Sequence, residues 1–507
     1  MPEPRTWQVV AGSAVLGLAL AVGAVAVAGP WDSGQRKAER DRAVTAGARG
    51  GAHHSPDSAA GDPRRPAPAP SAPAVLGALG LTDGSGSHGN TKPSTITRPG
   101  DDPAALAALL GPLLADPGLG PLRTATVVDA TTGKRLYGVG AGTPMTPAST
   151  VKIATTTAAL SALGPEHRIA TTTVADPGGR TVTLVGGGDP TLDRTRLKAL
   201  AEATARALKA PSGSGASGAP GPGPDASPDA AVRLAYDTSL YQGPVLHPIG
   251  PNENIAPVTA LMTDEGRLDH SHHGPADRST DPARDTATAF AGYLEKAGLT
   301  VEGDPRPGKA PKSARPLART ESARLDDLVE RTLTYSDNDL AEALVRQTAL
   351  AHKKPASFAG AERAVHDELA RLGLPLAGTR FADGSGLDRA DKVTGALLTG
   401  VLTRAADPAR PALRPVLTGL PVGGFSGTLA ERYGTAATTA GAGLVHAKTG
   451  TLTGVNTLAG TVVTPSGRLL AFAFLAGRTS APDAAQTALD RLSTALARPA
   501  GTATSPH

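Results

Sequence analysis

A serine and a lysine stand three residues apart at the start of a predicted helix, at Ser149 and Lys152. On a helix this spacing places both side chains on one face, about 5 to 6 Å apart, so the lysine amine can reach the serine hydroxyl. A lysine can serve as the base that activates a serine nucleophile when burial lowers its pKa. For the pair alone, an N-cap serine beside a solvated lysine is the commoner explanation.

A second group has a hydroxyl and an amide two residues apart, at Ser336 and Asn338, with Asp337 between them. On a tight loop both can face one cavity, where the hydroxyl relays a proton and the amide orders the lysine and a substrate amide. An alternative is that Ser336 or Asn338 is only the N-cap of a helix predicted over residues 340–351.

A third group follows an apolar, strand-like stretch and contains Lys448, Thr449, Gly450 and Thr451. A fixed cation with two hydroxyls along an edge strand can pair with a substrate carboxylate. Gly450 removes a side chain that would obstruct the approach of a backbone. The lone triplet is not distinctive, and the three groups gain meaning only together.

The elements that must position these groups follow from hydrophobic periodicity. Helices are predicted over residues 103–110, 149–163, 193–209, 283–297, 325–333, 340–351, 358–372, 393–404 and 481–497. Strands are predicted over residues 124–130, 135–139, 169–174, 181–185, 443–448, 454–463 and 469–476. Helices between two groups of strands predict an α/β (α+β) fold, in which a sheet flanked by helices is completed from both ends of the chain. The middle of the chain is expected to be an inserted domain.

The order Ser-x-x-Lys, Ser-Asp-Asn, Lys-Thr-Gly resembles the motif set of penicillin-binding proteins and serine β-lactamases. Further landmarks lie at residues 147–152, 186–192, 383–387, 427–429 and 448–452. Over residues 103–497 the chain therefore resembles the D-alanyl-D-alanine carboxypeptidase and endopeptidase family, the class C low-molecular-mass penicillin-binding proteins of peptidase family S13. The resemblance implies the transpeptidase fold of these proteins, with an antiparallel sheet flanked by helices and an inserted mixed domain.

By this resemblance, the nucleophile that becomes acylated is Ser149 and its base is Lys152. Ser336 and Asn338 complete the catalytic network, and Lys448 assists. The implied substrates are peptidoglycan stem peptides that end in D-alanine, and β-lactams are the implied inhibitors.

The same resemblance implies a substrate-binding strand in which Thr449 and Thr451 hold the terminal carboxylate beside Gly450. The backbone amides of Ser149 and Thr451 would form the oxyanion hole. A serine β-lactamase of the same fold is an alternative, but no acidic residue stands out that would hold a deacylating water. A non-catalytic wall-binding protein is a second alternative, and it would be expected to carry a broken motif. Carboxypeptidase and endopeptidase activity, the oligomeric state and the role of the inserted domain stay open.

The composition of the 507 residues excludes several kinds of site and partner. Cysteine is absent, which excludes disulfides, zinc-thiolate sites, iron-sulfur clusters and a cysteine nucleophile. Aromatic residues make up 3% and the net charge is only +4, with no dense basic block, so nucleic acid is not an expected partner. We expect no cofactor and no metal. The histidine-rich loop at 269–273 is interpreted as a solvated loop, since no distant partner motif accompanies it.

The domain boundaries follow from shifts in composition. We predict an amino-terminal membrane anchor or signal at 1–29, a Pro/Gly-rich disordered tether at 30–101, a catalytic domain at 102–166 plus 320–497, an inserted domain at 167–319 and a disordered tail at 498–507. A low-complexity insert is also predicted at 210–229.

The apolar stretch at residues 9–28 is long enough to cross a membrane, and signal cleavage and a retained anchor both stay open. Basic residues after this stretch would favour keeping the chain inside. We place it outside because its expected substrate, peptidoglycan, lies there, so the protein is expected to be extracytoplasmic and either membrane-anchored or secreted.

Overall fold

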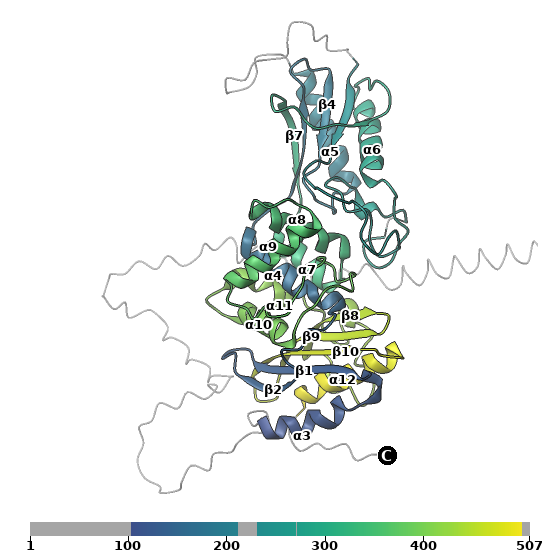
Figure 1. Cartoon of the computed structure of the whole chain (residues 1–507). Helices are drawn as coiled ribbons and strands as arrows, with labels where there is room; N and C mark the ends of the chain where they lie inside the picture. Colours follow the sequence, from purple (N-terminus) through teal and green to yellow (C-terminus); the bar gives the residue numbers. More distant parts are fainter. Residues whose placement is uncertain (1–102, 211–230, 270, 499–507) are drawn as a thin grey trace, which may run out of the picture. The chain divides into compact units, whose positions relative to one another are not determined.

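The structure, a computed structural model, describes residues 103–210, 231–269 and 271–498 (Figure 1). The predicted amino-terminal segment and tether lie outside these residues, as do nearly all of the insert at 210–229 and of the carboxyl-terminal tail. Among the described helices, none combines the length and the apolar character needed to cross a membrane.

One sheet consists of five antiparallel strands in the spatial order β2-β1-β10-β9-β8 (Figure 1). Its strands are β1 (Leu122–Asp129), β2 (Arg135–Val139), β8 (Val445–Leu452), β9 (Val455–Val463) and β10 (Leu469–Gly477). The first two strands come from the beginning of the described chain and the other three from its end, as predicted. The order leaves β8 at an edge of the sheet, where the segment 421–423 hydrogen-bonds to its first half, at Val445 and Ala447, before the Lys-Thr-Gly triplet.

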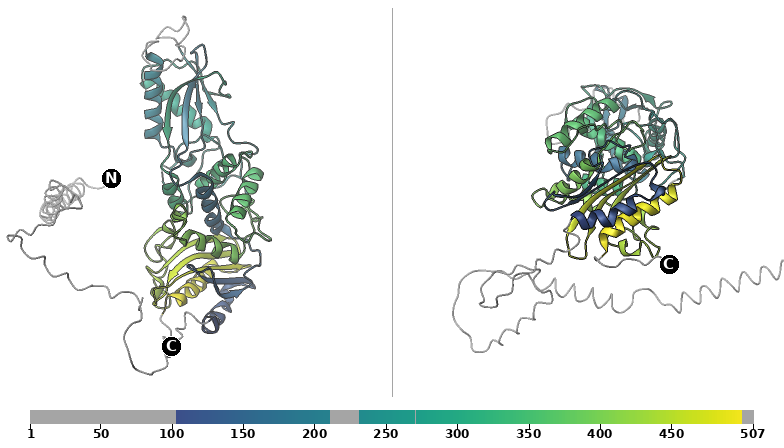
Figure 2. Two further views of the ribbon diagram at one scale, coloured as in Figure 1. Left: turned by 90° about the vertical axis from the view of Figure 1, so that its left-hand side faces the viewer. Right: turned by 60° about the horizontal axis from the view of Figure 1, so that its bottom comes forward.

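Helices cover both faces of this sheet (Figure 2). One face is covered by α3 (Pro103–Leu114) and α12 (Pro482–Ala497), and the other by α10 (Gly395–Ala406), against which α4 (Lys152–Leu163) packs. Side chains alternate across a strand, so successive residues of β10 enter different cores. Phe472 and Phe474 pack on the side of α3 and α12, while Ala471 and Ala473 pack on the other side. The predicted fold class, an antiparallel sheet flanked by helices, is confirmed.

Helix α4 lies at the centre of a helical layer. Its neighbours are α7 (Leu325–Thr334), α8 (Asn338–Ala351), α9 (Phe358–Arg371), α10 and the short α11 (Pro415–Thr418). Every residue from Lys152 to Leu160 is buried. A helix that is enclosed on all sides holds its first turn rigidly, which matters because that turn carries the lysine of the first motif. The sequence patterns did not predict α11, which has a single turn.

A second sheet lies within residues 170–321, which we call the inserted part, and has the strand order β6-β5-β4-β3-β7. Its elements are β3 (Ala170–Ala175), β4 (Thr181–Val185), α5 (Arg194–Lys209), β5 (Arg233–Asp237), α6 (Pro282–Lys296), β6 (Arg306–Pro307) and β7 (Arg315–Glu321). Strand β3 is antiparallel to β4 and β7, whereas β5 is parallel to β4 and β6. The sheet is therefore mixed, and it has its own apolar core with α5 and α6.

Candidate active site

Ser149 lies on a tight 3-10 turn, Ala148–Val151, directly before α4. Ala148 has a φ of 47°, a left-handed conformation that is uncommon for a residue with a side chain. The turn is held from two sides by close backbone contacts. A Cβ atom on Gly386 would lie 2.0 Å from the Ala148 carbonyl oxygen, and one on Gly450 would lie 2.6 Å from that of Pro147. Only glycine fits at these two positions, so the turn is locked in place.

Lys152 is the first residue of α4, and its side chain is fully buried. Its Nζ lies 3.1 Å from Ser149 Oγ, 2.7 Å from Asn338 Oδ1 and 2.6 Å from the carbonyl oxygen of Ser385. Burial lowers the pKa of Lys152 to about 8, although the negative charges of four carboxylates oppose the shift. These carboxylates are Asp383, Asp337, Glu342 and Asp391. The amine therefore loses its proton much more readily than a solvated lysine.

The second motif spans the loop between α7 and α8. Ser336 has a φ of 59°, and Asp337 is the N-cap of α8, because its carboxylate accepts the Leu340 N–H at 3.0 Å. The alternative in which Ser336 or Asn338 caps this helix is therefore wrong. With the cap supplied by Asp337, the Asn338 amide is free to accept from Lys152 and to donate to the Asn254 carbonyl at 2.9 Å.

Ion pairs between Arg331 and two buried carboxylates stabilise this loop. Arg331 Nε lies 3.1 Å from Asp337 Oδ2, and the same guanidinium contacts Glu265 of the inserted part. Asp339 accepts the Ala256 N–H at 2.9 Å. Burial, with the negative charge of Asp337 beside it, raises the pKa of Glu265, and the charge of Arg331 opposes this shift. The inserted part thus contacts the second motif directly through its side chains and its backbone.

The third motif lies on the edge strand β8. Lys448 is fully buried, and its Nζ donates to the Thr449 carbonyl oxygen at 2.9 Å. Burial, together with the positive charge of Lys152, places the pKa of Lys448 well below its usual range. The Thr449 hydroxyl donates to Thr428 Oγ1 at 2.8 Å. The space beside Gly450 is occupied by the chain itself, since an added Cβ would lie 2.1 Å from Thr457 Oγ1.

A cavity of about 290 Å³ joins the three motifs. Its lining residues are Ser149, Asn254, Arg267, His273, Gly274, Pro275, Arg278, Tyr335, Ser336, Asp337, Asn338, Leu387, Thr428, Thr449 and Thr451. Of the predicted site residues, Ser149, Ser336, Asn338, Thr449 and Thr451 line it. The remaining ones, Lys152, Lys448 and Gly450, are buried in its walls.

The sequence patterns missed the part of this cavity that comes from the inserted part. Arg267 and Arg278 belong to irregular loops that carry no motif, so no signal in one sequence would have found them, and His273 lies in the histidine-rich loop that was interpreted only as solvated. His273 packs edge-on against Tyr335, with ring centroids 4.5 Å apart. Asp269, His272 and His273 of the loop at 269–273 are exposed and Ser271 is half-buried, and the loop also borders the catalytic cavity through His273.

Two groups of described residues have the donor types and proximity that a metal ion requires. They are His247 with Glu342 and Asp383, and Glu265 with Asp337 and Asp339. Neither belongs to the loop at 269–273. In both groups the side chains already bind donors of the protein, such as Arg331 for Glu265 and the Gly384 and Ser385 N–H groups for Glu342.

The fold and the convergence of the three motifs define a serine hydrolase of the penicillin-binding and β-lactamase type. Penicillin-binding protein 4 from Haemophilus influenzae has a similar structure, with a TM-score of 0.62 and 22% sequence identity. The match covers 76% of this chain and 97% of that protein. At this identity the similarity establishes the fold.

The sequence model of the D-Ala-D-Ala carboxypeptidase 3 (S13) family matches residues 106–214 and 265–496. A carboxypeptidase of Mycobacterium tuberculosis is 35% identical over 457 residues, which cover 85% of this chain and 90% of the relative. The carboxypeptidase DacB of Mycolicibacterium smegmatis is 36% identical over 413 residues, covering 80% and 86%. A D-alanyl-D-alanine carboxypeptidase of an Actinomadura species is 30% identical over 477 residues, covering 77% and 84%.

The chain belongs to the D-Ala-D-Ala carboxypeptidase 3 (S13) family. It is therefore a hydrolase, a serine-type D-Ala-D-Ala carboxypeptidase with the penicillin-binding fold. The resemblance stated from the motifs is confirmed.

Proposed function

We propose that this carboxypeptidase removes the terminal D-alanine of peptidoglycan stem peptides by a two-step acyl transfer through Ser149. One observation carries the proposal. The amine of Lys152 meets the hydroxyl of Ser149, the amide oxygen of Asn338 and the carbonyl of Ser385 at 3.1, 2.7 and 2.6 Å. Three segments far apart in the sequence thus supply the partners of one buried nitrogen.

The contacts of Lys152 fit a neutral amine that acts as a base. A neutral amine has two N–H donors and one lone pair. Asn338 Oδ1 and the Ser385 carbonyl accept the two donors, so the lone pair is directed at the third and longest contact, the Ser149 hydroxyl. Lys152 takes the Ser149 proton as Oγ attacks the carbonyl carbon between the two D-alanines.

The tetrahedral intermediate carries its negative charge on the former carbonyl oxygen. The backbone N–H groups of Ser149 and Thr451 are the proposed oxyanion hole, which is consistent with their places on the cavity wall. The proton held by Lys152 passes through the Ser336 hydroxyl to the nitrogen of the departing D-alanine. Water then attacks the Ser149 ester and gives one of its protons to Lys152, which passes that proton to the Ser149 oxygen as the shortened peptide leaves.

The edge strand β8 supplies the proposed carboxylate site. Thr449 and Thr451 hydroxyls and the Lys448 amine lie along one strand, where the terminal carboxylate of the substrate can accept hydrogen bonds. Such a carboxylate would stabilise the charged form of Lys448, which burial disfavours in the free enzyme. A β-lactam offers the same carboxylate and a reactive amide, so a stable Ser149 adduct is expected. A β-lactam complex has been solved for the Haemophilus influenzae relative.

Intact-protein mass spectrometry after exposure to penicillin tests the nucleophile. The wild-type protein should gain the mass of one penicillin, and Ser149→Ala should gain none. Ser313→Ala, which changes an exposed serine of the inserted part, is the matched control and should behave as the wild type does. An adduct of the same mass on Ser149→Ala would show that another residue is acylated.

The same experiment separates the proposal from a serine β-lactamase. Among the described residues, no carboxylate hydrogen-bonds to Ser149, and the nearby acidic groups Glu342 and Asp383 are bound to backbone N–H groups. A water-activating acid of the β-lactamase kind is thus missing from the contacts of Ser149. The adduct is expected to persist, and rapid turnover of penicillin without accumulation would favour the β-lactamase.

We further propose that the enzyme acts outside the cytoplasmic membrane, held by the apolar stretch at residues 9–28 or released after its cleavage. The stretch supports this by its length and lack of charge. The supporting chemical argument is the substrate, since peptidoglycan lies outside the membrane. Amino-terminal sequencing of protein recovered from membrane and soluble fractions distinguishes a retained anchor from a cleaved signal.

A further inference from the structure

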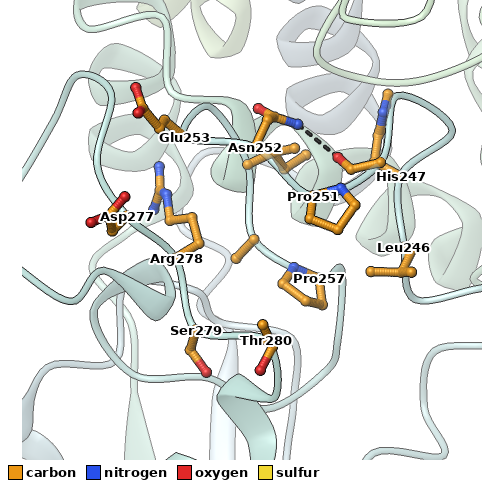
Figure 3. A pocket seen from close by; sticks show the side chains of 13 residues that line it. Leu246, His247, Pro251, Asn252, Glu253, Pro257, Asp277, Arg278, Ser279 and Thr280 are labelled. Atoms are coloured by element: carbon orange, nitrogen blue, oxygen red, sulfur yellow. Dashed lines mark hydrogen bonds between the residues drawn. The ribbon is translucent and has the colours of Figure 1, made fainter.

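A buried histidine of the inserted part contacts the catalytic part outside the three catalytic motifs, at the start of the landmark at residues 383–387. His247 lies in the irregular segment after β5, next to Leu246 and on the same loop as Pro251 and Asn252 (Figure 3). Its ring points away from Leu246 and Pro257, and its side chain is only 1% exposed. The Nε2 atom lies 2.9 Å from Asp383 Oδ2. Nδ1 accepts the backbone N–H of Ile249 at 3.3 Å, which leaves Nε2 as the donor to Asp383.

Asp383 organises the loop that follows it. Besides His247, its carboxylate accepts the Gly386 N–H at 2.6 Å, the Asp388 N–H at 2.7 Å and the Ser385 hydroxyl at 3.0 Å. A carboxylate with this many donors fixes the path of the chain over residues 383–388. Gly386 in turn packs on the Ala148 carbonyl, directly beside the nucleophile.

A second carboxylate holds the same loop from the other side. Glu342 Oε1 accepts the N–H groups of Gly384 and Ser385 at 2.9 and 3.0 Å, and the Thr155 hydroxyl donates to the Gly384 carbonyl at 2.8 Å. The Ser385 carbonyl shares a planar peptide unit with the Gly386 N–H, and the 2.6 Å bond from that N–H to Asp383 therefore fixes its orientation. That carbonyl is the 2.6 Å acceptor for Lys152.

We propose that His247 is a positioning residue for acylation, which acts through Asp383 to hold the Ser385 carbonyl against Lys152. The inference deepens the proposed function and rests on Ser149 and Lys152 being its nucleophile and base. A fixed Ser385 carbonyl occupies one N–H of the Lys152 amine and so directs the lone pair at Ser149. The inserted part thereby contributes to the geometry of the base as well as to the wall of the cavity.

The surroundings of His247 favour a permanent contact. Burial opposes protonation of the ring, but the hydrogen bond to Asp383 and the negative charge of Glu342 outweigh it and raise the pKa of His247. Burial alone would raise the pKa of Asp383, and the His247 hydrogen bond is the first of the contacts that lower it instead. The imidazole also packs edge-on against Phe358, with ring centroids 5.6 Å apart. Each partner therefore stabilises the hydrogen-bonding form of the other.

Two substitutions of similar size separate the hydrogen bond from simple packing. His247→Leu fills the space without a donor, whereas the amide of His247→Gln can place an N–H where Nε2 stands. The measured quantity is the second-order rate constant for acylation by penicillin at the pH of the wild-type plateau. Because small displacements of reacting groups cost up to about a hundredfold, the leucine variant should acylate about ten- to a hundredfold more slowly. The glutamine variant should retain most of the wild-type rate.

His352→Ala is the control, because His352 forms a comparable 2.9 Å contact with buried Glu368 between α8 and α9. It should leave the acylation rate unchanged. Equal rates for the leucine variant and the wild type would overturn the proposal, and so would equally slow leucine and glutamine variants. If His247→Leu does not fold, His247→Asn replaces it, since its shorter amide does not reach Asp383.

The test of Ser149 as the nucleophile is independent of the test of His247. If the wild type forms no penicillin adduct at Ser149, the proposed function fails whatever His247 does. If the wild type forms the adduct and the leucine variant forms it equally fast, only the role of His247 fails.

Discussion

Two walls of the catalytic cavity each bury a lysine completely, yet the two lysines have different surroundings. On the wall formed by α4 and α8, Lys152 has three oxygen partners and four carboxylates that counter the effect of burial on its pKa. On the wall formed by β8, Lys448 has one carbonyl partner, and the nearest charge that acts on it is the cation of Lys152. Equal burial therefore does not give the two lysines equal chemistry, because the neighbouring groups determine how far each pKa falls.

The two lysines are suited to different tasks. Lys152 has a pKa of about 8, close to the pH at which a base must both hold and release a proton. The Lys448 pKa lies well below its usual range, and an arriving anion would favour its charged form. The first lysine is suited to proton transfer and the second to recognition of the terminal carboxylate.

The largest effect is expected for Lys152→Met, which removes the base without adding a charge. General base catalysis contributes about 10²- to 10⁴-fold, so the acylation rate constant with penicillin should fall by that factor. The rate of adduct formation, followed by intact mass, measures it. Lys312→Met changes an exposed lysine and should have no effect. Acylation of the Lys152 variant at the wild-type rate would show that Lys152 is not the base.

Lys448→Met should have the next largest effect, and it should depend on the substrate. Hydrogen bonds to charged groups contribute about 1.5 to 3 kcal/mol, which corresponds to about ten- to 150-fold in kcat/KM. The loss is expected for a peptide that ends in a free D-alanine carboxylate. It should be much smaller for the same peptide with an amidated end. Equal losses for both peptides would show that Lys448 does not recognise the carboxylate.

The pH profile tests the state of Lys152 directly. The base must be neutral, so acylation should rise with pH and level off above about 8, where the pKa of Lys152 lies. Well below this value the rate should fall by roughly tenfold for each pH unit. The measurement is the acylation rate constant between pH 5 and pH 10 in the range where the protein remains folded. A profile that is flat from pH 6 to pH 9 would contradict the assignment.

The smallest effect is expected for Thr428→Val, which removes the acceptor for the Thr449 hydroxyl. A hydrogen bond of this kind contributes about 1 kcal/mol, so kcat/KM for the peptide substrate should fall about fivefold. The penicillin adduct on Ser149 should still form. An effect as large as that of Lys448→Met would show that the threonines contribute as much to carboxylate recognition as Lys448 does.

Much of the catalytic sheet could be predicted from local patterns. The strands at Arg135–Val139 and Val455–Val463 and the helix at Pro482–Ala497 match their predicted ranges closely, because their hydrophobic residues recur with the period of the element. The short strands β5 and β6 and the single turn α11 were not predicted. With two and four residues, β6 and α11 carry too few side chains for a period to be recognised, and their neighbours in space hold them in place.

The sequence by itself determined the chemical groups, their order and the family, because a nucleophile, a base and a carboxylate site require particular residue types at particular spacings. It also placed Lys152 near Ser149, since three residues on a helix are local geometry. Only the tertiary structure decided which groups surround that pair. Asn338 and Ser385 are 186 and 233 residues from Lys152 in the chain, and His247 acts from the inserted part. Burial and long-range contacts set the pKa values and orientations, and these depend on packing that no local pattern records.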